Sequence, residues 1–143
     1  MKSLAAASSP GTPRISRFAV EYQAGVCNIG PEEVARRRRA GHVGLAITLL
    51  LLVAMVAMGV PPLVRLFLFI PAAGAASGYL QAWLKFCAGF GRLGVYNFGR
   101  LGSTEAVVDE AARARDRRRS NQIGLASVLI GLAVAVVAVL LPV

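Results

Sequence analysis

Three long stretches without a charged residue constrain the fold more than any other feature of this sequence. They cover residues 43–64, 66–84 and 123–143 of a chain of 143 residues. A helix of about 20 apolar residues spans the hydrocarbon core of a bilayer, whereas three such runs in a soluble protein would leave almost no polar helix face. The sequence therefore predicts an all-α membrane protein with three transmembrane helices. The expected spans are residues 43–60, 62–87 and 122–141.

The polar segments before the first and third spans are expected to continue those spans as amphipathic helical extensions. Pro31 and the two glutamates after it mark the start of the first helix. Proline fits the first helical position, and acidic side chains suit the positive end of the helix dipole. The segment before the third span also runs from acidic to basic, and Ser103 or Thr104 is its expected cap.

The beginning of the chain has a different composition. Residues 1–17 are rich in Ala and Ser, include two prolines and show no apolar periodicity. Such a composition is typical of a disordered tail. We therefore expect a flexible N-terminal tail at residues 1–24, followed by a three-span membrane domain at residues 25–143 with a polar loop at 88–121.

The distribution of basic residues predicts the orientation of the spans. Of the 16 Lys and Arg residues, seven precede the first span, eight lie in residues 85–119, and only Arg65 lies between the first two spans. Basic loops remain on the cytoplasmic side of a membrane. The N-terminus and the 88–121 loop are therefore expected in the cytoplasm, with the C-terminus on the outer side of a cell inner membrane. Arg65 is expected to snorkel outward to the headgroups.

Two arginine runs lie directly before apolar spans, which favours a role at the membrane over nucleic-acid binding. Basic side chains in that position meet anionic headgroups. We expect these runs to hold anionic lipid or an acidic protein partner. Their residues are Arg36, Arg37, Arg38, Arg39, Arg117, Arg118 and Arg119.

A hexapeptide precedes each arginine run, and its two copies share four of six residues, at 25–30 and 94–99. The order of hexapeptide, acidic-to-basic segment, arginines and span is the same in both copies, which predicts an internal duplication. Glycine accepts positive φ and Asn bonds nearby backbone amides, so the motif is expected to supply turns and caps. The expected turn residues are Asn28, Gly30, Asn97 and Gly99.

Several short motifs within residues 27–98 also resemble a known family. They are Asn28 with Gly30, Gly41 at the head of an apolar helix, Cys87, and the Gly94-Val95-x-Asn97 sequence. Together they look like a small bacterial inner-membrane domain family of unknown function, found alone or fused to rhodanese domains. In this chain Ala88 stands where that family commonly has proline, and the third span has no counterpart. The resemblance implies a small inner-membrane module that touches sulfur chemistry through a rhodanese partner.

The second span contains a strip of small residues of the Gly-x-x-x-Gly type. Small residues at this spacing let another helix backbone approach closely, and Pro71 within the span predicts a kink. We interpret the strip as a helix-packing face. Its residues are Pro71, Gly74, Ser77 and Gly78.

The sequence offers little chemistry beyond this. Cys27 and Cys87 match no zinc-ligand spacing and the chain has one His, so two unpaired thiols are the first interpretation, while a redox or thiol pair stays open. No charged residue lies deep in a span, as pumps and proton relays usually require. We expect neither enzymatic activity nor a cofactor or metal.

These observations favour a structural or accessory subunit that packs against other membrane subunits or against itself. The alternative is a homo-oligomeric pathway, or a thiol-dependent handler, for a small neutral or sulfur-containing solute. The two differ in what accompanies the purified chain, a distinct subunit or only further copies.

Overall fold

The computed structural model describes residues 21–142 and confirms an all-α architecture with three helices long and apolar enough to cross a membrane. The first is α1 (Pro31–Ala57), of 27 residues. The second combines the 3-10 helix η1 (Pro62–Leu68) with α2 (Phe69–Trp83), and the third is α4 (Glu110–Leu140), of 31 residues. Between α2 and α4 lie the short helix α3 (Ala88–Leu93) and two strands, β1 (Val95–Tyr96) and β2 (Glu105–Ala106).

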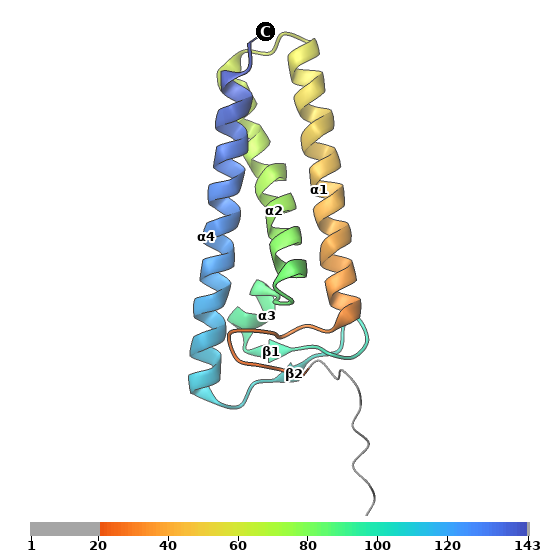
Figure 1. The fold of residues 1–143 in the computed structure, drawn as a ribbon, viewed down its shortest axis with the longest axis vertical. Coiled ribbons are helices and arrows are strands. Elements are labelled where there is room, and N and C mark those ends of the chain that lie inside the picture. Colours follow the sequence, from red (N-terminus) through yellow and green to blue (C-terminus); the bar gives the residue numbers. More distant parts are fainter. Residues whose placement is uncertain (1–20, 143) are drawn as a thin grey trace, which may run out of the picture.

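Helix α2 lies between α1 and α4 and packs on both, and it runs antiparallel to them (Figure 1). The α1–η1 connection and the C-terminus lie at one end of the molecule, whereas α3, β1 and β2 lie at the other. We call residues 43–83 and 122–142 the shaft. Residues 21–42 and 84–121 are called the head.

The contacts between the long helices depend on missing side chains. A Cβ atom at Gly78 would lie 2.6 Å from the Gly41 nitrogen, and one at Gly44 would lie 2.9 Å from the Ala75 nitrogen. On the other side of α2, a Cβ at Gly131 would lie 2.7 Å from the Ala73 Cβ. These distances allow no side chain, so α1 and α4 approach α2 at backbone contact, as in other membrane helix pairs.

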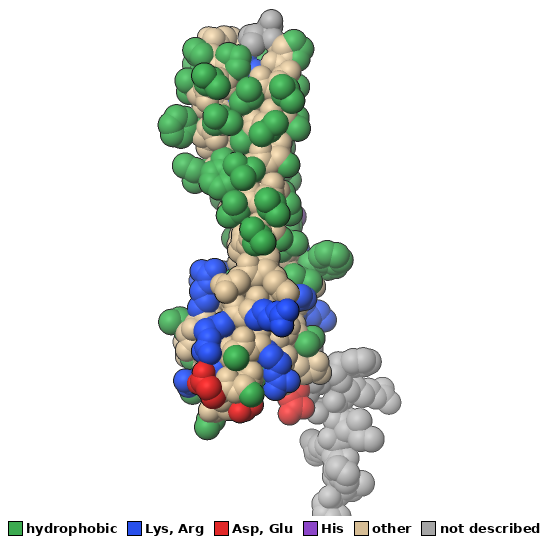
Figure 2. Space-filling view, turned by 90° about the vertical axis from the view of Figure 1, so that its left-hand side faces the viewer, with side chains coloured by type: hydrophobic (Ala, Val, Ile, Leu, Met, Phe, Trp, Pro, Cys, Tyr) green, Lys and Arg blue, Asp and Glu red, His purple; other side chains and the backbone are tan. Residues whose placement is uncertain are grey.

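Large apolar side chains of the shaft point outward, and small or hydroxyl side chains point inward. Leu50 is 70% exposed and Leu140 is 74% exposed, and Figure 2 shows hydrophobic side chains covering the upper part of the molecule. Thr48 and Ser127 are buried, and each donates its hydroxyl hydrogen bond to the carbonyl four residues earlier, on Gly44 and Ile123. This arrangement suits a hydrocarbon solvent, and the chain fits a multi-pass membrane protein.

The second span differs from its prediction in two ways. It begins as a 3-10 helix, and the α-helix ends at Trp83 rather than continuing to residue 87. Pro71 is the third residue of α2, so its missing N–H falls in the first turn and no mid-helix kink is needed. The change of helix type occurs just before this proline.

Two other boundaries also differ from the sequence prediction. Helix α4 is capped by Asp109, whose carboxylate accepts from the Ala111 and Ala112 amides, rather than by Ser103 or Thr104. Strand β2 follows Ser103 and Thr104 instead, before Asp109, and pairs antiparallel with β1. Residues 21–24, assigned to the tail by composition, belong to the head, whereas the rest of the proposed tail lies outside the described residues.

Arg65 is fully buried at the hairpin end and does not reach outward as expected. Its Nη1 donates to the Ala138 carbonyl at 3.2 Å and to the Leu141 carbonyl at 3.1 Å. Its Nε and Nη2 donate to the Val60 carbonyl. The last carbonyls of a helix have no partner within the helix, so Arg65 completes the end of α4 and ties it to the α1–η1 connection.

Candidate functional site

The two hexapeptides that the sequence repeats lie side by side in the head. The Asn97 amide donates to the Asn28 carbonyl at 3.0 Å, and the Gly30 amide donates to the Asn97 carbonyl at 2.8 Å. This is a parallel bridge between Ile29 and Asn97. The pairing brings residues 69 positions apart into one backbone contact, which the spacing of the motifs alone does not predict.

Two of the four hexapeptide glycines have positive φ, and a third lies at a close approach. Gly25 and Gly94, the first residues of the two copies, have φ of 71° and 70°, where other residues are disfavoured. A Cβ at Gly30 would lie 3.0 Å from the Phe98 Cα, so this glycine allows the two hexapeptide segments to approach. Gly30 is also the N-cap residue of α1, with Pro31 in the first turn.

Asn28 connects the α1 side of the head to the turn between α2 and α3. Its side-chain oxygen accepts from the Cys87 amide at 2.6 Å, and its Nδ2 donates to the Cys87 carbonyl at 3.0 Å. Its own amide donates to the Lys85 carbonyl. Asn28 is fully buried. Its side-chain amide therefore bonds backbone groups of Cys87 that water cannot reach.

Asn97 organises the other hexapeptide in the same buried region. Its Oδ1 accepts from the Gly99 amide at 2.9 Å and from the Ser103 hydroxyl, while its Nδ2 donates to the Arg100 carbonyl. Nδ2 also lies 3.5 Å from a carboxylate oxygen of Glu33, which is 1% exposed. Asn97 thus bonds three groups within the segment 99–103 and approaches Glu33 of α1.

A third contact attaches the first described residues to α4. The Tyr22 hydroxyl donates to one Asp116 oxygen at 2.7 Å, and the Gly25 amide donates to the other at 2.7 Å. Tyr22 also stacks on Tyr96, with ring centroids 4.8 Å apart. Burial, and then the hydrogen bond to Asp116, raise the pKa of Tyr22 well above its usual range, so the phenol stays protonated and can keep donating.

The two cysteines are free thiols with different surroundings. Cys87 caps α3, accepting from the Phe90 amide, and its sulfur also accepts from Arg37 Nη2 at 2.8 Å. Cys27 donates to the Ile29 carbonyl, and burial raises the pKa of its thiol. Within residues 21–142, no group of three or more His, Cys, Asp or Glu side chains is placed to hold a metal ion.

The structure divides the seven predicted arginines into two groups. Arg36 pairs with Glu33 at 3.6 Å, Arg117 pairs with Glu110 at 2.9 Å, and Arg37 reaches Cys87. The others have no carboxylate partner within 4.0 Å among the described residues. This second group is Arg38, Arg39, Arg118 and Arg119. Figure 2 shows Lys and Arg side chains gathered on the head beneath the hydrophobic shaft.

The predicted packing face on α2 is divided between two environments. Gly78 is buried against Gly41 of the same chain, whereas Gly74 is exposed and a Cβ there would meet nothing within 4 Å. The Ser77 hydroxyl accepts from Gln81 Nε2 at 2.8 Å. The two glycines therefore do not form one contact surface, and of the two Gly74 is the exposed one.

The sequence reasoning missed several residues that hold the head and hairpin together: Tyr22, Glu33, Arg65 and Asp116. A signal existed for two of them, since Asp116 is the only acid inside the basic segment 113–119 and Arg65 the only charge between two apolar runs. No protein-family model, no curated protein and no solved structure matches this chain.

Proposed function

We propose that this chain is a structural or accessory subunit of a membrane complex, in which a helix of another subunit packs on the Gly74 side of α2. The observation that carries the proposal is that Gly74 is exposed and that no contact among residues 21–142 needs a glycine there. Glycine in a helix costs about 0.5–1 kcal/mol relative to alanine. Small residues on an exposed membrane-helix face allow a partner backbone to approach closely.

The neighbours of Gly74 support the same assignment. Ile70, one helical turn before it, is 66% exposed, and Ser77 is half-buried with its hydroxyl already bonded to Gln81. A partner helix would therefore meet an apolar side chain, a gap without a side chain and a hydroxyl oxygen that already accepts one hydrogen bond. The surface presents one hydroxyl among apolar groups at these positions, so docking on it has a small desolvation cost.

The proposal includes an orientation and a role for the head. The head faces the cytoplasm of a cell with its N-terminus, and the hairpin and C-terminus face outward, because nearly all Lys and Arg residues lie on the head side. The arginines without carboxylate partners hold anionic lipid or an acidic partner. We propose no reaction and no cofactor for this chain.

The test compares glycine variants in the full-length protein purified in mild detergent. Gly74→Leu fills the open side of α2 without a clash inside the chain, so it should keep wild-type thermal stability and lose a stoichiometric partner subunit. Gly74→Ala adds one methyl group and should weaken retention of the partner less than Gly74→Leu does. Gly78→Leu clashes with Gly41 and should lower thermal stability. It shows how a folding defect of this helix appears in the same measurements.

The partner can be identified at the same position by a photo-crosslinking amino acid. Placed at Gly74, it should give one discrete protein adduct, whereas at Leu50 on α1 it should react with lipid. An adduct between two copies of this chain would instead favour the homo-oligomeric alternative. Partner retention unchanged in Gly74→Leu would disprove the proposed face.

A further inference from the structure

Two hollows lie next to each other where the shaft meets the head, one on each side of Leu80 of α2. The α1 hollow, of about 380 Å³, is lined by Arg38 and His42 of α1 and by Tyr79, Leu80 and Trp83 of α2. The α4 hollow, of about 360 Å³, is lined by Leu80 and Leu84 of α2 and by Arg119, Gln122 and Ile123 of α4. Each hollow is lined by one residue of an arginine run, Arg38 in the α1 hollow and Arg119 in the α4 hollow.

The cations of these hollows are not neutralised by any carboxylate of the described residues. Arg38 and Arg119 have no carboxylate oxygen within 4.0 Å among residues 21–142. Arg119 Nη1 reaches only the Gln122 side-chain oxygen, at 3.5 Å, and its Nε is buried without a hydrogen-bond partner. By contrast, Arg36 and Arg117, elsewhere in the same runs, are paired with glutamates. An anion in each hollow would satisfy donors that the chain leaves free.

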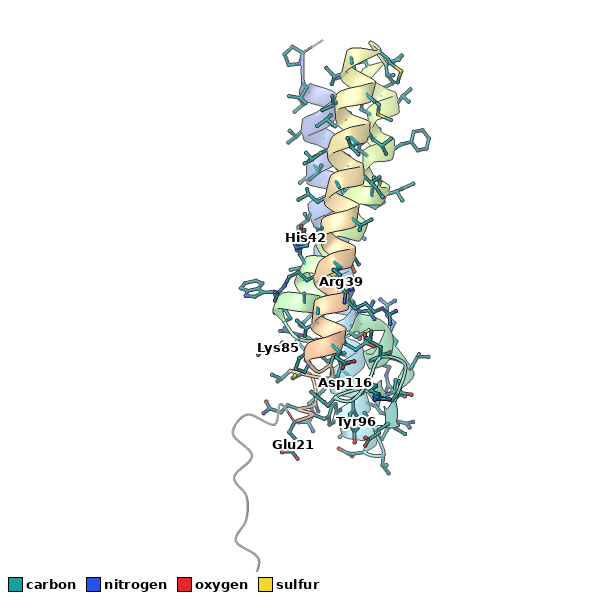
Figure 3. The ribbon with its side chains drawn as sticks, turned by 90° about the vertical axis from the view of Figure 1, so that its right-hand side faces the viewer. Glu21, Arg39, His42, Lys85, Tyr96 and Asp116 are labelled. Carbon is teal, nitrogen blue, oxygen red and sulfur yellow. The ribbon has the colours of Figure 1, made fainter. Side chains whose placement is uncertain are left out.

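The wall of the α4 hollow changes from polar to apolar toward the shaft, because Arg119 and Gln122 precede Ile123 and Ala126 along α4. In the α1 hollow, Tyr79 is held by a 2.6 Å hydrogen bond between its hydroxyl and His42 Nδ1, and Trp83 is 81% exposed. Trp and Tyr prefer the headgroup level of a bilayer. Figure 3 shows His42 and Arg39 on α1 above the head residues Tyr96 and Asp116. A ligand here needs an anionic group on the head side and an apolar body along the shaft.

We propose that each hollow binds the phosphodiester headgroup of an anionic phospholipid, with the acyl chains lying along the shaft. Arg38 and Arg119 bind the phosphate groups, Tyr79 and Trp83 border the lipid in the α1 hollow, and Leu80 and Leu84 border it in the α4 hollow. This inference rests on the proposed role of the arginines and makes it specific. It assigns the binding to two sites rather than to the whole basic surface.

Trp83 is the only tryptophan of the chain, so its fluorescence reports on the α1 hollow. The full-length protein is reconstituted in phosphatidylcholine vesicles containing a small fraction of phosphatidylglycerol with brominated acyl chains. Brominated phosphatidylglycerol should quench Trp83 more strongly than the same fraction of brominated phosphatidylcholine. A basic residue near an anionic surface contributes about 1 kcal/mol, so Arg38→Gln should lower this preference about fivefold.

Arg36→Gln is the matched control, because it removes an arginine of the same run outside the hollow and should keep the preference. Equal losses in Arg36→Gln and Arg38→Gln would overturn the hollows and leave only a general charge effect. No preference for phosphatidylglycerol in the wild-type protein would overturn the lipid role of the arginines as well. Neither outcome affects the partner face at Gly74, which its own variants test.

Native mass spectrometry of the same samples tests whether there are two sites. The wild-type protein should retain two phosphatidylglycerol molecules, Arg38→Gln and Arg119→Gln one each, and the double variant none. Arg117→Gln should retain two, because Arg117 lies outside the α4 hollow. A lipid count that does not depend on Arg119 would overturn the α4 site.

Discussion

The side-chain amide of Asn28 holds together two parts of the head that are 59 residues apart in the sequence. Both polar backbone groups of Cys87 bond to this one side chain, and they are buried where water cannot replace it. The sequence indicated Asn28 as a turn residue because Asn commonly bonds nearby amides. It did not reveal the partner, because a side-chain bond to Cys87 depends on where α2 ends.

Asn28→Ala is therefore predicted to weaken the folded head. The change leaves the amide of Cys87 buried without a partner, which costs about 1–3 kcal/mol, whereas the carbonyl of Cys87 keeps the Gly91 amide as a donor. We expect a clearly lower midpoint of thermal unfolding in detergent. Asn121→Ala, at an exposed position of α4, is the control and should leave the midpoint unchanged; an equal shift in both variants would contradict the assigned role of Asn28.

At the scale of the helical elements, the glycines decide how closely the spans pack. The sequence predicted small-residue packing on α2 but could not say which side of the helix meets its own chain. That choice depends on the positions of α1 and α4, which meet α2 through Gly41, Gly44 and Gly131. Hydropathy identifies helices by their length and composition, but it carries no information on their rotation.

The α2–α4 contact can be tested with two alanine substitutions in one helix. In Gly131→Ala the new Cβ would lie 2.7 Å from the Ala73 Cβ and 2.9 Å from its backbone nitrogen. In Gly124→Ala the new Cβ would meet only the end of the Arg92 side chain, at 3.2 Å, which can move. Overpacking typically costs about 1–3 kcal/mol. We expect Gly131→Ala to lower the unfolding midpoint in detergent and Gly124→Ala to maintain or raise it, because alanine favours helix.

The hairpin end depends on Arg65, which the sequence showed as a single charge but whose burial it did not predict. Arg65→Ala removes the donors of three carbonyls, on Val60, Ala138 and Leu141. We expect the end of α4 to fray and its amides to exchange hydrogen faster, with the head unaffected. Arg65→Lys should restore only part of the protection, because one ammonium cannot match the planar set of donors. Unchanged exchange in Arg65→Ala would contradict this role.

At the scale of the whole molecule, the sequence predicted the spans well and the head poorly. Apolar runs are local signals, so their length was enough to predict three helices. The head instead depends on pairs such as Tyr22 with Asp116 and Asn28 with Asn97, which join segments more than 60 residues apart. Short polar segments carry no periodic signal for such pairing. The duplication and the resemblance to the rhodanese-associated family remain predictions.

The orientation of the molecule in the membrane is the last prediction, and the exposure of two residues makes it testable. Val108 in the head is 92% exposed, and a Cβ at Gly59 in the hairpin would meet nothing within 4 Å. Cysteines introduced as Val108→Cys and Gly59→Cys should therefore be accessible from opposite sides of the membrane. The native Cys27 and Cys87 are buried and should contribute little background.

A maleimide that cannot cross the membrane should label Gly59→Cys in intact cells and leave Val108→Cys unlabelled. After the membrane is permeabilised, both should react. The reason is the concentration of Lys and Arg on the head, which opposes its transfer across the membrane. Gly59 has φ of +64°, a conformation strained for cysteine, so thermal unfolding of that variant is the control for its fold. Labelling of Val108→Cys alone in intact cells would show that the head faces outward.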